Sequence, residues 1–238
     1  RPQPFMPGPA GGVPRNRHKK QASQPANGDV TARDHIDALA PHNPQQAKLL
    51  RRASAYVRDQ NWKQAMEALQ FLLELTEDSL VRLPNGKWVS VRNEANRMLG
   101  KFPQEFRERY RLQHGGIAKQ LLQDAYEEND RNKFVVVATQ FFQTEAGYQA
   151  ANHLGSLHFD RGEFGMATRW FAELLQARAV VTNDPKWRLK AALAFQQAGN
   201  ASVREDLLKE LASTSLDGLE LGGTRIDPSR WLDEVGSV

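Results

Sequence analysis

The chain of 238 residues contains no cysteine. Without a thiol it forms no disulfide, binds no metal through thiolates and has no cysteine nucleophile. The chain also lacks any apolar run near the ~20 residues that a helix needs to cross a bilayer, so no transmembrane segment is predicted. The absence of cysteine by itself is compatible with an oxidising envelope compartment and with the cytoplasm.

Most of the chain carries no net charge, because its basic and acidic residues balance. Five Lys or Arg and one Asp lie in residues 1–30, which leaves 27 of the 32 basic and 27 of the 28 acidic residues for the remainder. A nucleic-acid-binding domain carries a basic stripe on its folded surface, because phosphate neutralisation supplies much of the affinity. The neutral remainder therefore argues against a nucleic-acid partner.

The one basic cluster comprises Arg15, Arg17, Lys19 and Lys20 and lies in a Pro- and Gly-rich stretch without hydrophobic periodicity. We expect residues 1–42 to be a leader that is extended or disordered unless bound. These four residues are candidate partner contacts. A solvated linker and weak binding to an anionic surface are the alternative interpretations.

Residues 43–212 show the apolar spacing of consecutive amphipathic helices. Asn43 before Pro44 is typical of a helix start. The breaks between helices are short, so neighbouring helices are expected to pair as αα-hairpins. The spacing predicts helices at roughly 44–60, 62–73, 92–99, 103–128 with a kink at Gly115-Gly116, 132–142, 145–160, 163–176, 186–198 and 203–212.

One local exception interrupts this pattern. Residues 79–91 alternate around Asn85-Gly86, which predicts a single inserted β-hairpin. Beyond Ser213 the helical spacing is lost. Residues 213–238 are expected to form a connector or C-terminal tail, with an extended stretch at 216–223 and Trp231-Leu232 docking back onto the fold. The predicted class is all-α with one β-hairpin.

The clearest internal repeat is a set of small and large residues at fixed spacing, Leu154-Gly155, Gly162, Phe164, Ala167 and Phe171. It resembles the tetratricopeptide pattern. Small side chains at Gly155 and Ala167 let two helices approach closely, and Gly162 permits the turn between them.

Weaker copies of this unit begin at Gln60-Asn61-Trp62 and Ala191-Ala192, and another lies around Phe134. In the last copy Asn132 stands where the turn glycine belongs, and asparagine tolerates a left-handed backbone. The anchors Trp62, Phe134, Phe164 and Ala201 are 72, 30 and 37 residues apart. This irregular period predicts a degenerate tetratricopeptide-like (TPR-like) solenoid.

A narrower resemblance is carried by Thr144-Glu145-Ala146-Gly147-Tyr148, Ala150-Ala151, Leu154-Gly155 and Asp160-Arg161-Gly162. These residues are similar to the helical N-terminal region of bacterial envelope proteins whose C-terminal part is a pyrroloquinoline-quinone-type β-propeller. The resemblance implies that this chain is the N-terminal portion of something longer. It also implies the bacterial cell envelope or periplasm, with the cytoplasm as the alternative.

No hydrolytic triad, phosphate loop or metal cluster has recognisable spacing. His153, His158 and Asp160 are near one another in sequence, and packing is the alternative to a metal site there. We therefore assign no catalytic, cofactor-binding or metal-binding residue and no cofactor. Trp88 on the hairpin and Trp170 beside Phe171 are candidate partner anchors, because tryptophans dominate interface hot spots; packing against neighbouring helices is the alternative for both.

These observations predict a non-enzymatic protein–protein interaction scaffold or a structural subunit of a larger bacterial assembly. Its partners would be other proteins or further copies of itself. Two alternatives are a helical appendage of a longer β-propeller envelope protein and a weak binder of anionic surfaces through the leader.

Overall fold

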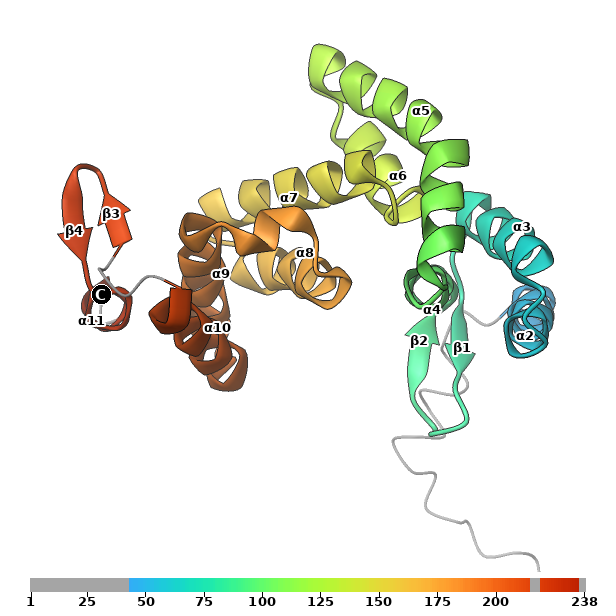
Figure 1. Cartoon of the computed structure of the whole chain (residues 1–238), viewed down its shortest axis with the longest axis horizontal. Helices are drawn as coiled ribbons and strands as arrows, with labels where there is room; N and C mark the ends of the chain where they lie inside the picture. Colours follow the sequence, from blue (N-terminus) through green and yellow to red (C-terminus); the bar gives the residue numbers. More distant parts are fainter. Residues whose placement is uncertain (1–42, 215–218, 236–238) are drawn as a thin grey trace, which may run out of the picture. The chain divides into compact units, whose positions relative to one another are not determined.

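The computed structural model describes residues 43–214 and 219–235, and most of them lie in helices (Figure 1). The predicted all-α class is confirmed. The leader, with Arg15, Arg17, Lys19 and Lys20, lies outside the described residues. The elements follow in the order α2 (Pro44–Arg58), α3 (Trp62–Glu74), β1 (Leu80–Arg82), β2 (Trp88–Ser90), α4 (Val91–Gly100), α5 (Gln104–Glu128), α6 (Arg131–Gln140), α7 (Glu145–Asp160), α8 (Phe164–Ala177), the short 3₁₀-helix η1 (Val180–Asn183), α9 (Pro185–Gln197), α10 (Ala201–Thr214), β3 (Leu219–Leu221), β4 (Thr224–Ile226) and α11 (Pro228–Val235).

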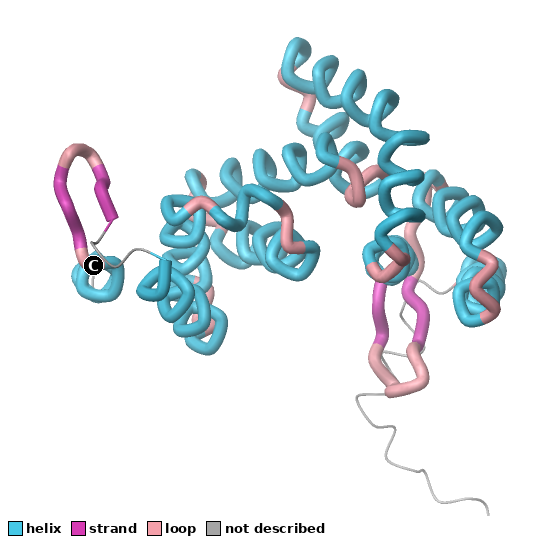
Figure 2. Tube along the Cα trace, viewed as in Figure 1, coloured by secondary structure: helices cyan, strands magenta, loops and turns pink. Residues whose placement is uncertain are grey.

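The expected β-hairpin is present between α3 and α4 (Figure 2). Strands β1 and β2 pair antiparallel with Val81 opposite Val89, and Gly86 in the loop has a φ of 80°. The hairpin leads directly into α4, because the Ser90 side chain accepts a hydrogen bond from the N–H of Asn93 at 3.1 Å and so caps that helix.

A second hairpin lies near the C-terminus, where an extended stretch was expected. Strands β3 and β4 are joined by Gly222 and Gly223, both with positive φ, and α11 follows them. Two consecutive residues with positive φ are the requirement of the tight two-residue hairpin turn. The expected docking of Trp231-Leu232 is confirmed for Leu232, which is fully buried and whose carbonyl accepts a hydrogen bond from Gln196.

The same turn joins the two helices of each of four pairs, α2–α3, α5–α6, α7–α8 and α9–α10. One residue has a left-handed backbone, and the N–H of the next residue donates to the carbonyl five positions earlier. This is the Schellman motif. The left-handed residues are Gln60, Asn129, Gly162 and Gly199, and the closing hydrogen bonds are Asn61 to Tyr56, Asp130 to Ala125, Glu163 to His158 and Asn200 to Phe195, at 2.8–3.0 Å.

These turns correct the sequence alignment of one repeat. Asn132 was expected at the left-handed position, but it lies inside α6, and Asn129 is the left-handed residue. The error arose because Phe134 was aligned with Phe164, although Phe164 is the first residue of its helix and Phe134 the fourth. The left-handed residues of these four turns are 69, 33 and 37 positions apart, and Arg178 at the end of α8 is left-handed as well.

Helices α7 and α8 approach closely at Gly155. A Cβ atom at this position would lie 2.6 Å from Cε1 of Phe171, closer than real Cβ contacts. Ala167 and Phe171 on α8 are fully buried. The steric role expected for these small residues is confirmed.

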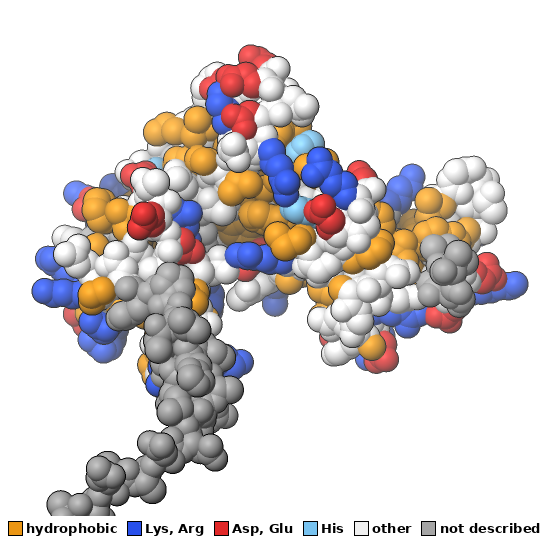
Figure 3. All heavy atoms as spheres, turned by 180° about the vertical axis from the view of Figure 1, so that it is seen from behind, with side chains coloured by type: hydrophobic (Ala, Val, Ile, Leu, Met, Phe, Trp, Pro, Cys, Tyr) orange, Lys and Arg blue, Asp and Glu red, His pale blue; other side chains and the backbone are white. Residues whose placement is uncertain are grey.

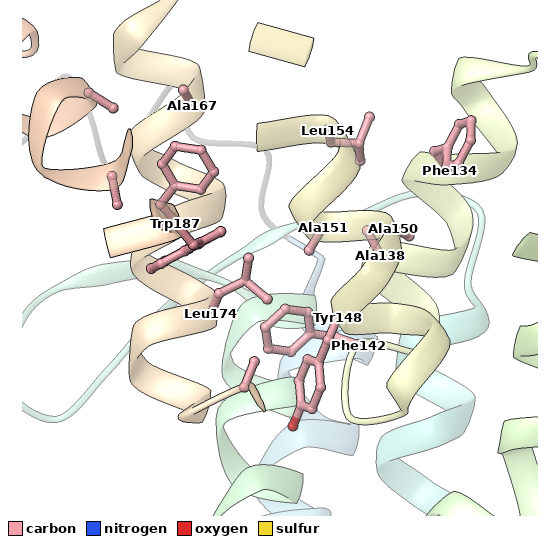
Figure 4. Close-up of a cluster of buried hydrophobic side chains, with 14 of the residues drawn as sticks. Phe134, Ala138, Phe142, Tyr148, Ala150, Ala151, Leu154, Ala167, Leu174 and Trp187 are labelled. Carbon is pink, nitrogen blue, oxygen red and sulfur yellow. The ribbon is translucent and has the colours of Figure 1, made fainter. Parts of the chain in front are cut away.

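Buried apolar side chains form two clusters. The first joins α2, α3 and α4 with the start of α5, including Leu69 and Tyr110. The second runs from Ala118 on α5 to Leu232 on α11. Figure 4 shows part of the second, with Leu174 pointing toward the edge-to-face pair Phe142 and Tyr148.

Helix α5 contributes to both clusters. Its axis bends part-way along its length (Figure 2), and Gly115-Gly116 lie near its middle, where a kink was expected. Within residues 43–214 and 219–235, no helix combines the length and apolar character needed to traverse a membrane.

Candidate functional site: the α4–α8 groove

Two adjoining pockets, of about 230 and 30 Å³, lie between α4, α6 and α8. They share Asn96, Phe142 and Glu173, and we call them together the α4–α8 groove. The residues lining it are Asn93, Asn96, Arg97, Gly100, Lys101, Arg107, Ala138, Thr139, Phe142, Gln143, Arg169, Trp170, Glu173, Gln176, Ala177 and Arg178.

The floor of the groove is held by hydrogen bonds between residues distant in sequence. The side-chain amide of Asn96 donates to the carbonyl of Thr139 at 2.8 Å, and the amide of Gln143 donates to the carbonyl of Asn96 at 3.0 Å. The Tyr148 hydroxyl in turn donates to the side-chain oxygen of Gln143 at 3.1 Å. Buried polar contacts of this kind fix α4 against α6 and α7.

Gly100 makes room for this arrangement. A Cβ atom there would lie 3.0 Å from Nε2 of Gln143. A larger residue at the end of α4 would therefore require the Gln143 side chain to shift by a few tenths of an ångström.

Three buried polar atoms of groove residues have no hydrogen-bond partner among the described residues: Oδ1 of Asn96, Nε of Arg107 and Nε1 of Trp170. One other such atom, on Arg92, lies outside the groove. Leaving a buried donor or acceptor unpaired costs about 1–3 kcal/mol. These atoms are shielded from solvent, so a bound group would supply their partners only after a shift of the groove side chains.

The orientation of the Asn96 amide follows from its neighbours. Its nitrogen faces the Thr139 carbonyl. Exchanging the amide nitrogen and oxygen would bring two acceptors together, so Oδ1 is the unpaired atom. Asn96 is only 7 % exposed, which makes this acceptor costly to leave unsatisfied.

Positive charge dominates the larger pocket. Arg97, Lys101, Arg107 and Arg178 line it, against the single acid Glu173. Arg97 forms a two-point ion pair with the buried Glu94, and the hydrogen bonds to that carboxylate are the main cause of the raised pKa of Arg97. Burial raises the pKa of Glu173, and nearby Arg169 partly offsets this effect.

The two candidate tryptophans occupy different places. Trp170 is half-buried and lines the smaller pocket with its indole N–H unpaired. Trp88 lies on β2 opposite Arg82 and is not among the residues lining the groove.

The two histidines considered for a metal site are packed instead. His158 is buried, with Nδ1 bound to Glu163 and Nε2 3.0 Å from Arg131. Because Arg131 donates to Nε2, Nδ1 carries the proton. His153 stacks on Phe134 at 4.2 Å between ring centroids. In the described part of the chain, no three His, Asp or Glu side chains are grouped for a metal ion.

Sequence reasoning missed most groove residues, including Asn96, Arg107 and Glu173. They come from separate elements, and none belongs to a motif, so only the folded arrangement brings them together. A signal was available for Trp170 alone, since its neighbour Phe171 occupies the core position of the repeat.

The fold and groove define an all-α protein of paired helices with a polar, basic groove. Comparison of the chain with protein-family models, with curated proteins and with solved structures finds no match. The function is therefore argued from the residues of the chain.

Proposed function

We propose that this chain is a non-enzymatic, TPR-like interaction scaffold that binds a segment of another protein in the α4–α8 groove. The observation that carries the proposal is that three of the four unpaired buried polar atoms among the described residues belong to side chains of residues lining one groove. An extended protein segment offers a backbone N–H and carbonyl at each residue, and so supplies both kinds of missing partner.

Three features support a TPR-like arrangement. Four helix pairs are closed by the same turn, and two successive spacings between their left-handed residues are 33 and 37. Each pair also packs against the next along the chain, α6 on α7 and α8 on α9. Stacked helix pairs of this kind build extended binding surfaces.

Trp170 is the proposed anchor of the groove. Its ring packs against the second apolar cluster, while its N–H remains unpaired. A tryptophan with an apolar body and a free polar atom is a common interface hot spot.

The proposal is tested by site-specific photo-crosslinking in an extract of the source organism. A benzophenone amino acid replaces Arg169, an exposed groove residue, or Glu205, an exposed residue of α10. We expect discrete protein adducts from position 169. Position 205 serves as the control for non-specific capture.

Adding Trp170→Ala to the first variant is expected to abolish the adducts, whereas Trp88→Ala tests the hairpin anchor separately. Absence of groove adducts, or adducts that persist unchanged without Trp170, contradicts the proposed binding surface. Thermal unfolding of each variant verifies that it remains folded.

The proposal includes the bacterial cell envelope as the location, supported by the resemblance around residues 144–162. A role as a structural subunit of a larger assembly overlaps with the scaffold function. Size-exclusion chromatography with light scattering separates the two, because a stable oligomer of the isolated chain argues for the subunit and a monomer for the free scaffold.

A further inference from the structure

Three cations in the larger pocket of the α4–α8 groove form no ion pair with the described residues. Arg97 is neutralised by Glu94, but Lys101, Arg107 and Arg178 form no ion pair with any residue in 43–214 or 219–235. Among the residues that the structure describes, Glu173 is the only acid that lines the same pocket. Lys101 and Arg178 are exposed and Arg107 is half-buried, so the pocket presents positive charge that a bound anion would complement.

The anion must fit beside an acceptor. Asn96 and Glu173 both line the larger pocket, and their acceptor oxygens disfavour a highly charged ligand such as a phosphate chain. Acidic and basic side chains are interspersed on the face of the molecule drawn in Figure 3. A single carboxylate, followed by neutral hydrogen-bonding groups, matches this distribution better than a polyanion does.

We propose that the segment bound in the α4–α8 groove carries an acidic side chain, whose carboxylate is held by Lys101, Arg107 and Arg178. A shift of the groove side chains would let a backbone N–H of the same segment donate to Oδ1 of Asn96 and a backbone carbonyl accept from Nε1 of Trp170, two atoms that the packed groove shields from solvent. This inference rests on the proposed function and names the chemical class of the partner.

The contacts to the acidic side chain and the contacts to the backbone lie in different parts of the groove. The basic residues line the larger pocket of about 230 Å³, whereas Trp170 lines the adjoining smaller one. Asn96 lines both. Charge therefore selects the acidic residue, and the unpaired atoms hold the backbone beside it.

The experiment uses the whole chain and a displayed library of random peptides as the probe. Peptides selected on the immobilised chain are synthesised with a fluorophore, and their affinity is measured by anisotropy. We expect the selected sequences to be enriched in Asp and Glu. Changing the acidic residue to its amide is expected to weaken binding at least about tenfold, because a charge-assisted hydrogen bond is lost.

Variants of the protein locate the binding site. Lys101→Glu is expected to weaken binding about tenfold or more. The control Lys63→Glu makes the same charge change at an exposed site on α3 outside the groove and is expected to leave affinity within about twofold. Arg107→Met and Trp170→Phe remove the buried donors, and each is expected to weaken binding severalfold.

Three outcomes overturn the acidic-segment assignment. The first is selection of peptides without acidic enrichment, and the second is an equal effect of Lys101→Glu and Lys63→Glu. Displacement of the peptide by single-stranded RNA at lower concentration than by unlabelled peptide also overturns it, in favour of a polyanion. If no peptide binds the chain at all, the scaffold function itself fails.

Discussion

The absent side chain of Gly155 sets the separation of α7 and α8. Its Cα lies against the buried ring of Phe171. This ring also packs edge-to-face on the ring of Trp187, with 5.3 Å between the ring centroids. Because Phe171 is fully buried, its ring has no free space into which to move.

We predict that Gly155→Ala lowers the free energy of unfolding by about 1–3 kcal/mol, because the added methyl group overpacks this contact. The matched control is Gly165→Ala on α8, where a Cβ atom meets nothing within 4 Å. This control is expected to be neutral or to stabilise by up to about 1 kcal/mol through helix propensity. Urea unfolding measures both; equal effects of the two substitutions would contradict the steric explanation.

A single side-chain atom also matters for binding at Trp170. It is adjacent in sequence to a core residue, yet its indole N–H has no partner among the described residues. A single polar atom thus distinguishes a groove residue from the core residue beside it.

At the scale of elements, the turns between paired helices matter most. Glycine occupies the left-handed position at two of the four turns, but Gln60 and Asn129 occupy the others with φ of 57° and 49°. A left-handed backbone costs a non-glycine residue about 1–2 kcal/mol. Asparagine tolerates this conformation, so the turn at Gln60 is the strained one, and tertiary packing maintains it.

We predict that Gln60→Gly stabilises the protein by up to about 1 kcal/mol, since relief of strain exceeds the added entropy of the unfolded chain. Gln64→Gly, at an exposed position inside α3, is the matched control and is expected to destabilise by about 1 kcal/mol. Thermal unfolding compares them. A loss of stability in both variants would show that the turn is not strained.

At the scale of the whole described fold, two apolar clusters share α5. Tyr110 belongs to the first cluster, and its hydroxyl donates to Gln70 at 2.7 Å, whereas Leu122 belongs to the second. Contacts otherwise run mainly between neighbouring elements. Stability in such folds is approximately a sum of local terms.

We predict that Leu69→Ala, which opens a cavity in the first cluster, costs about 2–5 kcal/mol locally. Hydrogen exchange is expected to accelerate in α2, α3 and α4 and to stay unchanged in α9 and α10. Leu154→Ala in the second cluster is the reciprocal variant, with faster exchange in α7 and α8. Uniform acceleration across the chain would indicate one cooperative unit instead.

The helices and the first hairpin were predictable because their signals are local. Asn43 and Pro44 mark a helix start, and Asn85-Gly86 marks a turn, through interactions within a few residues. The second hairpin was missed although Gly222-Gly223 is also a local signal. The predicted position of the turn at Asn132 was wrong. The prediction aligned the aromatic residues Phe134 and Phe164, although the turns before them lie at different distances.

The sequence by itself determined the helical periodicity, the caps, the small residues between α7 and α8 and the absence of thiol chemistry, because each depends on residue type or on near neighbours. Only the tertiary structure decided the groove. Asn96, Arg107 and Trp170 lie on three helices, and an atom is unpaired only with respect to everything packed around it. Hydrogen-bond satisfaction and local charge balance are properties of that packing, and no sequence pattern contains them.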